Sequence, residues 1–401
     1  MPERSLPHLL LFGWYSEGTG FTRVLRAIVP YLRRHYRITW MGVGYRGPAR
    51  EIEPGVQVRP TNLHGGDMVG AYGAGREWDG LAADAVLALN DLWYLEHYSR
   101  GLGPVIGTVP MVGYLPLDGD IPHPSLVADL TGFSALYTYT KHAARQLGAA
   151  LEGCGRPTPV GVAGHGVDLA TFTPDPAALA AGFDPAVRMR LAARLFGLSE
   201  PSWVVLNASR PDPRKRIDLT IDGFARFARG RPPHVRLCLH QAIAHPQFVD
   251  PLRQQADALG IMDRLLWWPP SGAPLDDAAL VALYNACAVG INTSLGEGFG
   301  LVSFEHGAAG VPQVVPGHRA LHELWDDAAL LLPARQVRTA HSPLVMGEVD
   351  AGDVAGALGR LYEDEAAYRR AAHGARARAG SADLTWPAAA AALLDGLRHA
   401  R

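Results

Sequence analysis

The chain has little of what marks disulfide-rich, metal-cluster or membrane-spanning proteins. Its 401 residues include only three cysteines, Cys154, Cys238 and Cys287, and none belongs to a Cys-x-x-Cys pair. This argues against a disulfide framework and a cysteine metal cluster, and favours free thiols in a reducing compartment. The apolar runs HLLLFGW and AAAAALL, near the two ends, are both too short to cross a membrane. We therefore expect a soluble, cytoplasmic protein.

Charge of either sign is also scarce. Charged residues make up 19% of the chain and the net charge is −2, which disfavours a protein whose whole surface binds nucleic acid. Apolar residues make up 48%, an ordinary globular composition. Because single domains usually have about 100–200 residues, a chain of this length predicts two.

Short apolar runs alternate with amphipathic helical patterns along the whole chain, which predicts an α/β fold with parallel sheets covered on both faces. In the first half the expected strands are His8–Phe12, Ile38–Val43, Ala85–Leu89, Pro110–Tyr114, Ala135–Thr138 and Val160–Ala163. In the second half they are Trp203–Ala208, Val235–His240, Leu265–Trp268, Val289–Asn292, Gln313–Val315 and Ala329–Leu332.

A stretch rich in Pro, Ala and Gly, FTPDPAALAAGFDP, separates the two halves. We expect two Rossmann-like domains that face a central cleft: residues 1–175, a linker over 176–200, and residues 201–380. One large α/β domain is the alternative, which the length disfavours. Parallel sheets bind ligands at the carboxyl ends of their strands, so polar residues at those ends are the candidate site residues.

The stretch GEGFGLVSFEHG, from Gly296 to Gly307, follows one such strand and opens a helix. We expect the backbone N–H groups of Phe299, Gly300 and Leu301 to bind a phosphate, because a helix N-terminus carries a partial positive charge. Gly298 and Gly300 let the backbone approach a ligand closely. Glu305, one turn inside the helix, can accept two hydrogen bonds from a ribose diol, and Glu297 reaches what lies beyond the phosphates. The alternative is a loop glutamate and a solvated helix glutamate.

A second strand end carries basic residues. In NASRPDPRKRID, Arg210 and Lys215 flank a Pro-Asp-Pro turn, and two cations at a strand end suit a diphosphate. A basic loop that caps the next helix is the alternative. The glycine-rich turn GWYSEGTGFTRV is a weaker signal, in which Gly18, Thr19 and Gly20 could approach the donor.

Further strand ends in the first half supply candidates for the acceptor side. Asp91 and Trp93 lie in NDLWYLEHY after one strand, where a helix cap with a buried aromatic is the favoured interpretation of Trp93. Tyr114 and His165 stand at the ends of two other expected strands.

Taken together, these residues resemble family 4 glycosyltransferases of the GT-B fold, the retaining class that uses nucleotide sugars. The resemblance covers nearly the whole chain and is most specific in the E-x7-E pattern of Glu297 and Glu305. It is supported by SRPDPRKRID, HGVDLATFTP, VDAGDVAGALGRLYED and LTWPAAAAALLDGL. It implies that Glu297 binds donor-sugar hydroxyls, that Glu305 binds the ribose, and that Arg210 and Lys215 neutralise the diphosphate. It also implies that the last helix, within residues 381–401, crosses back onto the N-terminal domain.

The chain departs from this family at one point. Many relatives carry a histidine near the reacting carbon, in the loop where this chain reads GYLPLDGD, with Tyr114 and Asp118. Asp118 is a candidate base or acceptor-orienting carboxylate, and a simple turn aspartate is an equal alternative. Asp118 and Asp120 also spell the D-x-D of metal-dependent glycosyltransferases. We expect no metal, because Arg210, Lys215 and the helix N-terminus already supply positive charge.

The first expected helix has a basic face. Arg23, Arg26, Arg33, Arg34 and Arg37 share one arc, opposite the apolar residues of the same segment. This face could bind an anionic lipid or a nucleic-acid acceptor, but a solvated face is the favoured interpretation.

The sequence therefore predicts a retaining glycosyltransferase that uses a nucleoside-diphosphate sugar, with UDP favoured over GDP and no cofactor required. Charge stabilisation on the departing diphosphate and alignment of the acceptor would carry catalysis. A related enzyme that acts on a nucleotide sugar without transfer, such as an epimerase or hydrolase, and a non-catalytic nucleotide-sugar-binding protein are the alternatives.

Overall fold

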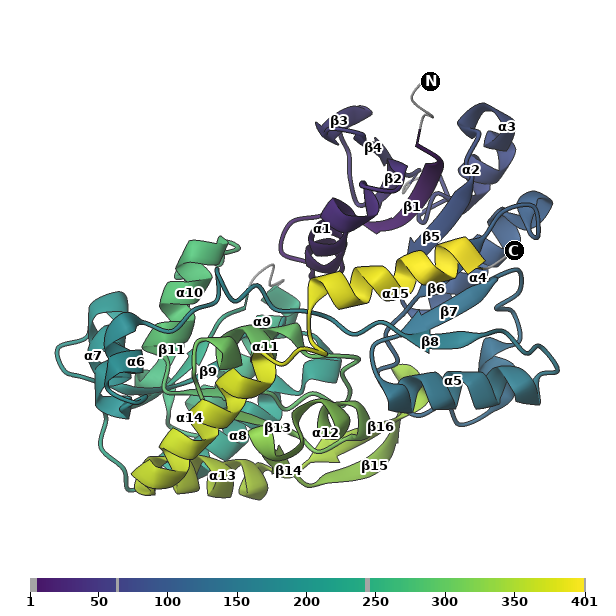
Figure 1. Cartoon of the computed structure of the whole chain (residues 1–401). Coiled ribbons are helices and arrows are strands. Elements are labelled where there is room, and N and C mark those ends of the chain that lie inside the picture. The colour runs from purple at the N-terminus through teal and green to yellow at the C-terminus, as the bar shows by residue number, and fades with distance from the viewer. Residues whose placement is uncertain (1–5, 63–64, 242–245, 400–401) are drawn as a thin grey trace. The chain divides into compact units, whose positions relative to one another are not determined.

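The computed structural model describes residues 6–62, 65–241 and 246–399, and its chain divides into two compact units (Figure 1). Unit 1 comprises Met1–Gly166 and Asp383–Arg401, and unit 2 comprises Val167–Ala382. The chain therefore passes from one unit to the other before the segment 176–200 that we expected as a linker. That segment folds as part of unit 2 into α6 (Pro176–Ala180) and α7 (Pro185–Phe196), because Asp175 and Asp184 cap the two helices.

Unit 1 is built on an eight-stranded sheet with the order β3-β4-β2-β1-β5-β6-β7-β8. Its strands are β1 (His8–Trp14), β2 (Arg37–Val43), β3 (Arg50–Glu53), β4 (Val56–Pro60), β5 (Ala85–Leu89), β6 (Met111–Tyr114), β7 (Ala135–Thr138) and β8 (Val160–Val162). All neighbours pair in parallel except β3 and β4. Its helices are α1 (Gly20–Leu32), α2 (Ala71–Arg76), α3 (Trp78–Leu81), α4 (Leu92–Gly101), α5 (Lys141–Gly153) and α15 (Trp386–His399).

Unit 2 is built on a six-stranded parallel sheet with the order β11-β10-β9-β12-β13-β14. Its strands are β9 (Trp203–Asn207), β10 (Val235–Leu239), β11 (Leu265–Trp267), β12 (Val289–Ile291), β13 (Gln313–Pro316) and β14 (Leu330–Leu332). An antiparallel hairpin joins β15 (Ala334–Thr339) to β16 (Ser342–Val349). Its other helices are α8 (Ile217–Ala228), α9 (Pro246–Ala258), α10 (Asp277–Ala286), α11 (Leu301–Ala308), α12 (Arg319–Trp325), α13 (Ala351–Glu363) and α14 (Glu365–Ala379).

The predicted α/β fold with two Rossmann-like units is confirmed. Each of the twelve expected strands forms, with its ends shifted by two residues at most. The sequence reasoning missed two hairpins, β3–β4 and β15–β16. In these strands buried apolar residues are few or alternate with polar ones, so they lack the continuous apolar runs that mark strands buried on both faces.

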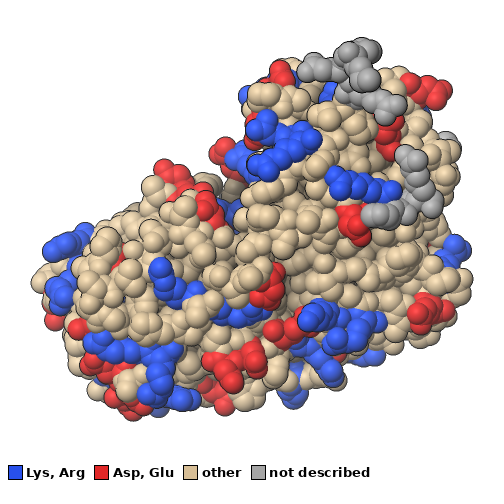
Figure 2. Space-filling model, in the orientation of Figure 1, with Lys and Arg blue, Asp and Glu red and all other residues tan. Residues whose placement is uncertain are grey.

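Helix α1 shows how an amphipathic pattern becomes a packed element. Thr19 caps its N-terminus by accepting a hydrogen bond from the N–H of Thr22, and its apolar face is buried. On the basic face, Arg26 lies 4.0 Å from Glu17 and Arg33 lies 3.4 Å from Glu53. Surface acids thus accompany part of the arginine face, and Figure 2 shows both signs of charge interspersed over the visible surface.

The last helix, α15, belongs to unit 1, where it packs against α1, β5 and β6 (Figure 1). Trp386 at its start stacks on His165, with ring centroids 5.5 Å apart. Near its end, Gly396 lies against the ring of Tyr137, where an added Cβ would come within 2.6 Å. The C-terminal segment therefore completes the core of the N-terminal unit. In the part of the chain that the structure describes, no helix is long and apolar enough to cross a membrane.

Arg188, a fully buried arginine of α7, binds the residues that follow α11, the helix that carries part of the candidate site. The guanidinium of Arg188 donates hydrogen bonds to the carbonyl oxygens of Asn285 (3.2 Å), Ala309 (2.8 Å) and Gly310 (2.7 Å). Ala309 and Gly310 directly follow α11, whose last carbonyls need partners outside the helix. Burial lowers the pKa of Arg188, but these carbonyls keep the charged group solvated by the protein.

We expect Arg188→Ala to lower the free energy of unfolding by about 3 kcal/mol or more, because it leaves several buried carbonyls unsatisfied and opens a cavity. The exposed Arg190 on the same helix provides the matched control, and Arg190→Ala should change stability by less than about 0.5 kcal/mol. Urea unfolding of the three proteins measures both effects. Equal, small decreases in the free energy of unfolding for both variants would show that the hydrogen bonds of Arg188 contribute nothing to stability.

Candidate active site

The candidate site is built where the neighbouring strands β9 and β12 end at the same edge of the unit 2 sheet. Asn292 comes directly after β12. Its side-chain amide donates to Glu297 Oε1 at 3.1 Å, and its Oδ1 accepts from the N–H of Ser294 at 2.8 Å. A single buried asparagine therefore both shapes the turn and orients the first of the two glutamates.

Glu297 forms a buried ion pair with Lys215. Lys215 Nζ lies 2.5 Å from Glu297 Oε1, and Arg214 Nη1 lies 3.7 Å from Oε2. Only 10% of the Glu297 side chain and 13% of the Lys215 side chain are exposed. Burial by itself would raise the pKa of Glu297. The charges of Lys215 and Arg214, with hydrogen bonds from Lys215 and Asn292, instead hold it at about 2, so the carboxylate is ionised at neutral pH.

Backbone contacts join the loop after β9 to the loop after β12. The N–H of Leu295 donates to the carbonyl of Arg214 at 2.8 Å, and the Arg214 guanidinium donates in return to the carbonyl of Gly296. The Thr293 hydroxyl donates to the carbonyl of Arg216 at 2.8 Å. The position of Lys215 relative to Glu297 is therefore fixed by backbone as well as by charge.

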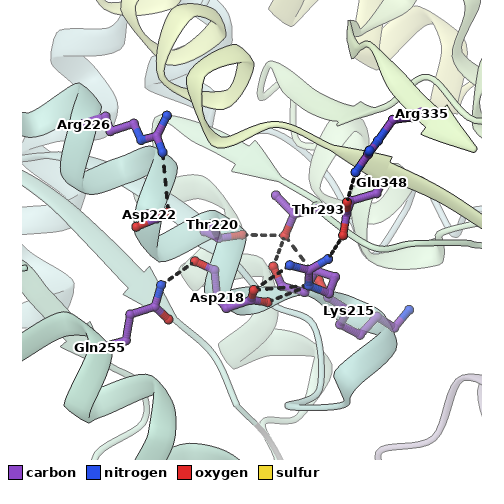
Figure 3. A network of polar contacts seen from close by, with 10 residues as sticks. Lys215, Asp218, Thr220, Asp222, Arg226, Gln255, Thr293, Arg335 and Glu348 are labelled. Atoms are coloured by element: carbon purple, nitrogen blue, oxygen red, sulfur yellow. Dashed lines mark hydrogen bonds and ion pairs between the residues drawn. The ribbon is translucent and has the colours of Figure 1, made fainter. Parts of the chain in front are cut away.

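A network of charged side chains surrounds this junction (Figure 3). Arg216, in the left-handed region at φ +45°, pairs with Asp218 at 2.8 Å and also with Glu348 of β16. Glu348 in turn pairs with Arg335 of β15 at 2.9 Å. The N–H of Gly347 donates to the carbonyl of Leu295 at 2.8 Å, so the β15–β16 hairpin supports both loops of the site.

The glycine-framed turn leads into α11 as the sequence predicts. Gly300 is the residue before the helix and has φ +83°, a backbone conformation that favours glycine. The first N–H groups of a helix have no partner within it. The N–H of Ser303 already donates to the carbonyl of Gly300 at 3.0 Å, which leaves those of Leu301 and Val302 to face an anion. The ring of Phe299 packs on Phe304 at 4.7 Å and anchors the turn.

Glu305 lies on α11 and is 4% exposed. The Tyr284 hydroxyl of α10 donates to Glu305 Oε2 at 3.3 Å, and the Tyr284 ring stacks on His306 at 5.0 Å. His306 is itself buried, which lowers its pKa to about 3. Packing from α10 thus holds Glu305 in a defined position.

Arg210, the other cation predicted to bind the diphosphate, has a different environment from Lys215. Arg210 lies on an exposed turn, and no described residue forms an ion pair with it, so its role in binding a diphosphate stays a prediction. The cation found beside Lys215 is Arg214, which the sequence reasoning did not single out. The run Pro-Arg-Lys-Arg indicates that cations follow β9. Which of the three adjacent cations lies beside Glu297 depends on the fold.

Sequence reasoning also missed His318, which follows β13 at the same sheet edge. Its Nε2 is buried and has no hydrogen-bond partner among the described residues. Burial lowers the pKa of His318 to about 4, while the charge of Glu297 opposes this shift and those of Arg214 and Lys215 add to it. His318 therefore lies within the electrostatic field of the Glu297–Lys215 pair. Its position after a strand was the available signal.

The remaining candidates lie in unit 1. Gly18, Thr19 and Gly20 form the turn before α1, in which Thr19 acts as the helix cap. Tyr114 and His165 are buried rather than displayed at the edge: the Tyr114 hydroxyl donates to the carbonyl of Ala163 at 2.9 Å, and burial lowers the pKa of His165 to about 3. Neither side chain is accessible to a ligand in this conformation, because both pack with Tyr139 beneath the edge.

Asp91, Asp118 and Trp93 lie closer to the surface. Asp91 precedes α4, and Asp118 is half-buried in the loop after β6. Trp93 is 44% exposed, so the expectation that this aromatic is buried was wrong.

Asp120 of the D-x-D pair is bound by His142, whose Nε2 lies 2.7 Å from Asp120 Oδ1. Over residues 6–62, 65–241 and 246–399, no group of three or more His, Cys, Asp or Glu is placed to hold a metal ion.

Known proteins resemble this chain in sequence. A family model described as "Family 4 Glycosyltransferase in conflict systems" matches residues 166–393. A D-inositol 3-phosphate glycosyltransferase of Xylanimonas cellulosilytica is 34% identical over 232 residues, which cover 57% of this chain and 49% of the relative. One from Thermomonospora curvata is 30% identical over 288 residues, covering 69% and 61%. The match with the first of these relatives thus spans about half of that relative's length.

Solved structures share the fold over nearly the whole chain. The structure of Anabaena HepE in complex with UDP and glucose superposes with a TM-score of 0.68 at 17% identity, covering 97% of this chain and 98% of the other. Sucrose-phosphate synthase from Thermosynechococcus elongatus gives 0.74 at 16% identity, covering 97% and 98%. These likenesses establish the GT-B fold. Because the family model matches more than half of the chain, the protein belongs to the family 4 glycosyltransferases, in the group described as family 4 glycosyltransferases in conflict systems.

Proposed function

We propose that the protein is a retaining glycosyltransferase that moves a sugar from a nucleoside diphosphate to an acceptor hydroxyl. The observation that carries this proposal is the buried Lys215–Glu297 pair beside the N-terminus of α11. A cation for a diphosphate and a carboxylate for sugar hydroxyls then stand next to each other. A buried ion pair is often no more stable than an apolar pair of similar volume, so stability alone does not account for this arrangement.

The two ends of the donor are assigned to the two glutamates. Glu305, one turn inside α11, would accept hydrogen bonds from the ribose diol, and Glu297 would bind hydroxyls of the transferred sugar. Lys215, Arg210 and the first N–H groups of α11 would bind the diphosphate. Lys215 must then exchange the carboxylate of Glu297 for the phosphate, which frees Glu297 for the sugar.

In the chemical step, the bond between the anomeric carbon and the donor phosphate oxygen breaks. A bond from the acceptor oxygen forms on the same face of the sugar. The acceptor proton passes to the departing phosphate oxygen, so no protein nucleophile is needed. Lys215 and the helix N-terminus stabilise the negative charge that develops on the diphosphate, and they act in a site from which water is largely excluded.

The identity of the nucleotide, the lack of a cofactor and the cellular setting are also part of the proposal. UDP is favoured over GDP as the nucleotide, and the likeness to a structure that contains UDP and glucose supports this choice. No cofactor is required. The three cysteines are free, in keeping with a reducing, cytoplasmic setting. A role for the basic face of α1 with an anionic lipid or a nucleic acid has less support, because Glu17 and Glu53 lie beside two of its arginines.

A turnover assay with UDP-glucose and a panel of sugars and polyols tests the proposed function. We expect release of UDP that depends on the acceptor, and its loss in Lys215→Met. Arg194→Met, an exposed change in the same unit, is the control and should keep full activity. Release of UDP at the same rate without acceptor would indicate a hydrolase. Binding without any release, over a panel of nucleotide sugars, would indicate a binding protein.

The two glutamates should differ in their effects on binding and turnover. Glu305→Gln should weaken the affinity for free UDP, because its contact to the ribose is present in the ground state. Glu297→Gln should lower kcat, because the transferred sugar gains positive charge as the bond breaks, and should leave UDP affinity intact or raise it by freeing Lys215. Each loss should be roughly 10- to 100-fold. Titration calorimetry with UDP beside steady-state kinetics measures both, and the reverse pattern would exchange the two roles.

Activity should not depend on a divalent metal, because Lys215, Arg210 and the N-terminus of α11 supply the positive charge that the diphosphate needs. Turnover measured after dialysis against EDTA should equal turnover with added Mg²⁺ or Mn²⁺. A loss of activity that Mn²⁺ restores would contradict this account and would direct attention to Asp118 and Asp120.

A further inference from the structure

His318 stands on the side of Glu297 that is opposite to Lys215. In the unit 2 sheet, β12 lies between β9 and β13, so the loop that carries Glu297 lies between the loops that carry Lys215 and His318. His318 is the second residue after β13, and the charge of Glu297 acts on its ring. Because parallel strands end at one edge of a sheet, a cation and a histidine flank the same carboxylate.

The backbone holds His318 against the turn of Glu297. On one side, the His318 carbonyl accepts a hydrogen bond from the N–H of His322 in α12, at 2.9 Å. On the other side is Gly347 of β16, where an added Cβ would lie 2.9 Å from the His318 Cβ. The N–H of Gly347 donates to the carbonyl of Leu295, two residues before Glu297, at 2.8 Å. The β15–β16 hairpin therefore packs the histidine onto the turn that carries the carboxylate.

One nitrogen of the His318 ring lacks a protein partner. Nε2 is buried and forms no hydrogen bond within the part of the chain that the structure describes. Buried polar atoms are almost always hydrogen-bonded, so this nitrogen calls for a partner that the fold does not supply. Glu297 beside it differs, because Lys215 and Asn292 both donate to its carboxylate. A ligand that reaches Glu297 from the β13 side would therefore meet a ring nitrogen ready to form a hydrogen bond.

The ring of His318 is neutral at physiological pH, since burial lowers its pKa to about 4. A neutral imidazole has one N–H donor and one bare nitrogen acceptor, and the tautomer decides which of them is Nε2. A hydroxyl both donates and accepts, so it can bind Nε2 in either tautomer. A phosphate oxygen only accepts, and a neutral ring offers no charge to balance its own. The chemistry of this nitrogen therefore favours a sugar hydroxyl over a phosphate.

The groups that suit a phosphate lie on the other side of Glu297. Lys215, from the loop after β9, lies 2.5 Å from the carboxylate, and the N-terminus of α11 follows Glu297 in the chain. A diphosphate bound by these groups leaves Glu297 and the side toward β13 for the sugar.

We propose that His318 is a specificity-determining residue for the donor sugar, and that its Nε2 forms a hydrogen bond with one hydroxyl of the transferred ring beside Glu297. This inference rests on the proposed function, which supplies the nucleotide sugar. A donor that lacks this hydroxyl leaves a buried ring nitrogen unsatisfied. A site built to bind a hydroxyl rejects analogues without it more strongly than an apolar pocket rejects a change in size.

Substitutions at His318 test which ring nitrogen matters, with titration calorimetry of UDP-glucose on the full chain. His318→Phe keeps the size of the ring and removes both nitrogens, and it should weaken UDP-glucose binding about tenfold. His318→Gln places an amide where Nε2 stands and should restore most of the affinity. His318→Asn places its amide where Nδ1 stands and should bind as weakly as His318→Phe. His322→Phe, at an exposed histidine of α12, is the matched control and should change nothing.

Deoxy analogues of the donor distinguish a sugar contact from a structural role. The affinities of UDP-glucose and of its 2-, 3-, 4- and 6-deoxy analogues are measured for the unchanged chain and for His318→Phe. At one ring position, the loss caused by removing the hydroxyl should be smaller in His318→Phe by about fivefold or more. At the other positions the two proteins should lose equally. A histidine that only supports the fold would weaken all five donors by the same factor, and that result would overturn the inference.

A titration with UDP alone keeps this inference separate from the proposed function. Each variant should bind UDP as tightly as the unchanged chain, because UDP lacks the sugar. If His318→Phe weakens UDP as much as UDP-glucose, Nε2 binds the diphosphate, and the inference fails while the proposed function stands. If UDP binds and UDP-glucose does not, the sugar contact is overturned and the nucleotide site stands. If the unchanged chain binds neither, the proposed function fails and this inference with it. Thermal unfolding of each variant excludes loss of the fold as a cause.

Discussion

One buried ion pair, between Lys215 and Glu297, organises the C-terminal unit around its sheet edge. Two opposite charges with little access to water are stable only if each finds partners at close range. Asn292 and Arg214 supply those partners, and backbone bonds between the two loops hold the pair in register. The arrangement places a cation and a carboxylate side by side at the sheet edge, next to the N-terminus of α11.

The surrounding structure restricts the movement of this pair. The β15–β16 hairpin holds the Leu295 carbonyl through Gly347 and the Arg216 side chain through Glu348. Gly347 has no room for a side chain, because an added Cβ would lie 2.9 Å from that of His318. Arg188 secures the far end of α11 from another helix. Preorganisation of this kind lowers the cost of ordering charged groups when a ligand binds.

The two units divide the chemistry by charge. The unit 2 edge combines cations with a helix N-terminus and suits a diphosphate. The unit 1 edge instead carries carboxylates, with Asp91 directly before α4 and Asp118 and Asp120 in the loop after β6.

The sequence by itself determined the elements and the motif. Continuous apolar runs marked twelve of the fourteen strands in the two large sheets, because strands buried on both faces need apolar side chains at every position. Gly300 indicated the turn before α11, because the left-handed backbone conformation at that position favours glycine. These signals are local, so they can be recognised without the fold.

Only the tertiary structure decided which side chains meet. Lys215 and Glu297 are 82 residues apart, and Arg214 rather than Arg210 lies beside them because the turn after β9 directs one arginine inward and leaves the other exposed. The same is true of His318, of the β15–β16 hairpin that supports the site, and of Tyr114 and His165, which the packing of α15 and Tyr139 buries. Trp93 is exposed although its residue type favours burial. Burial and pairing depend on which elements pack against each other, and that information is not contained in any short stretch of the chain.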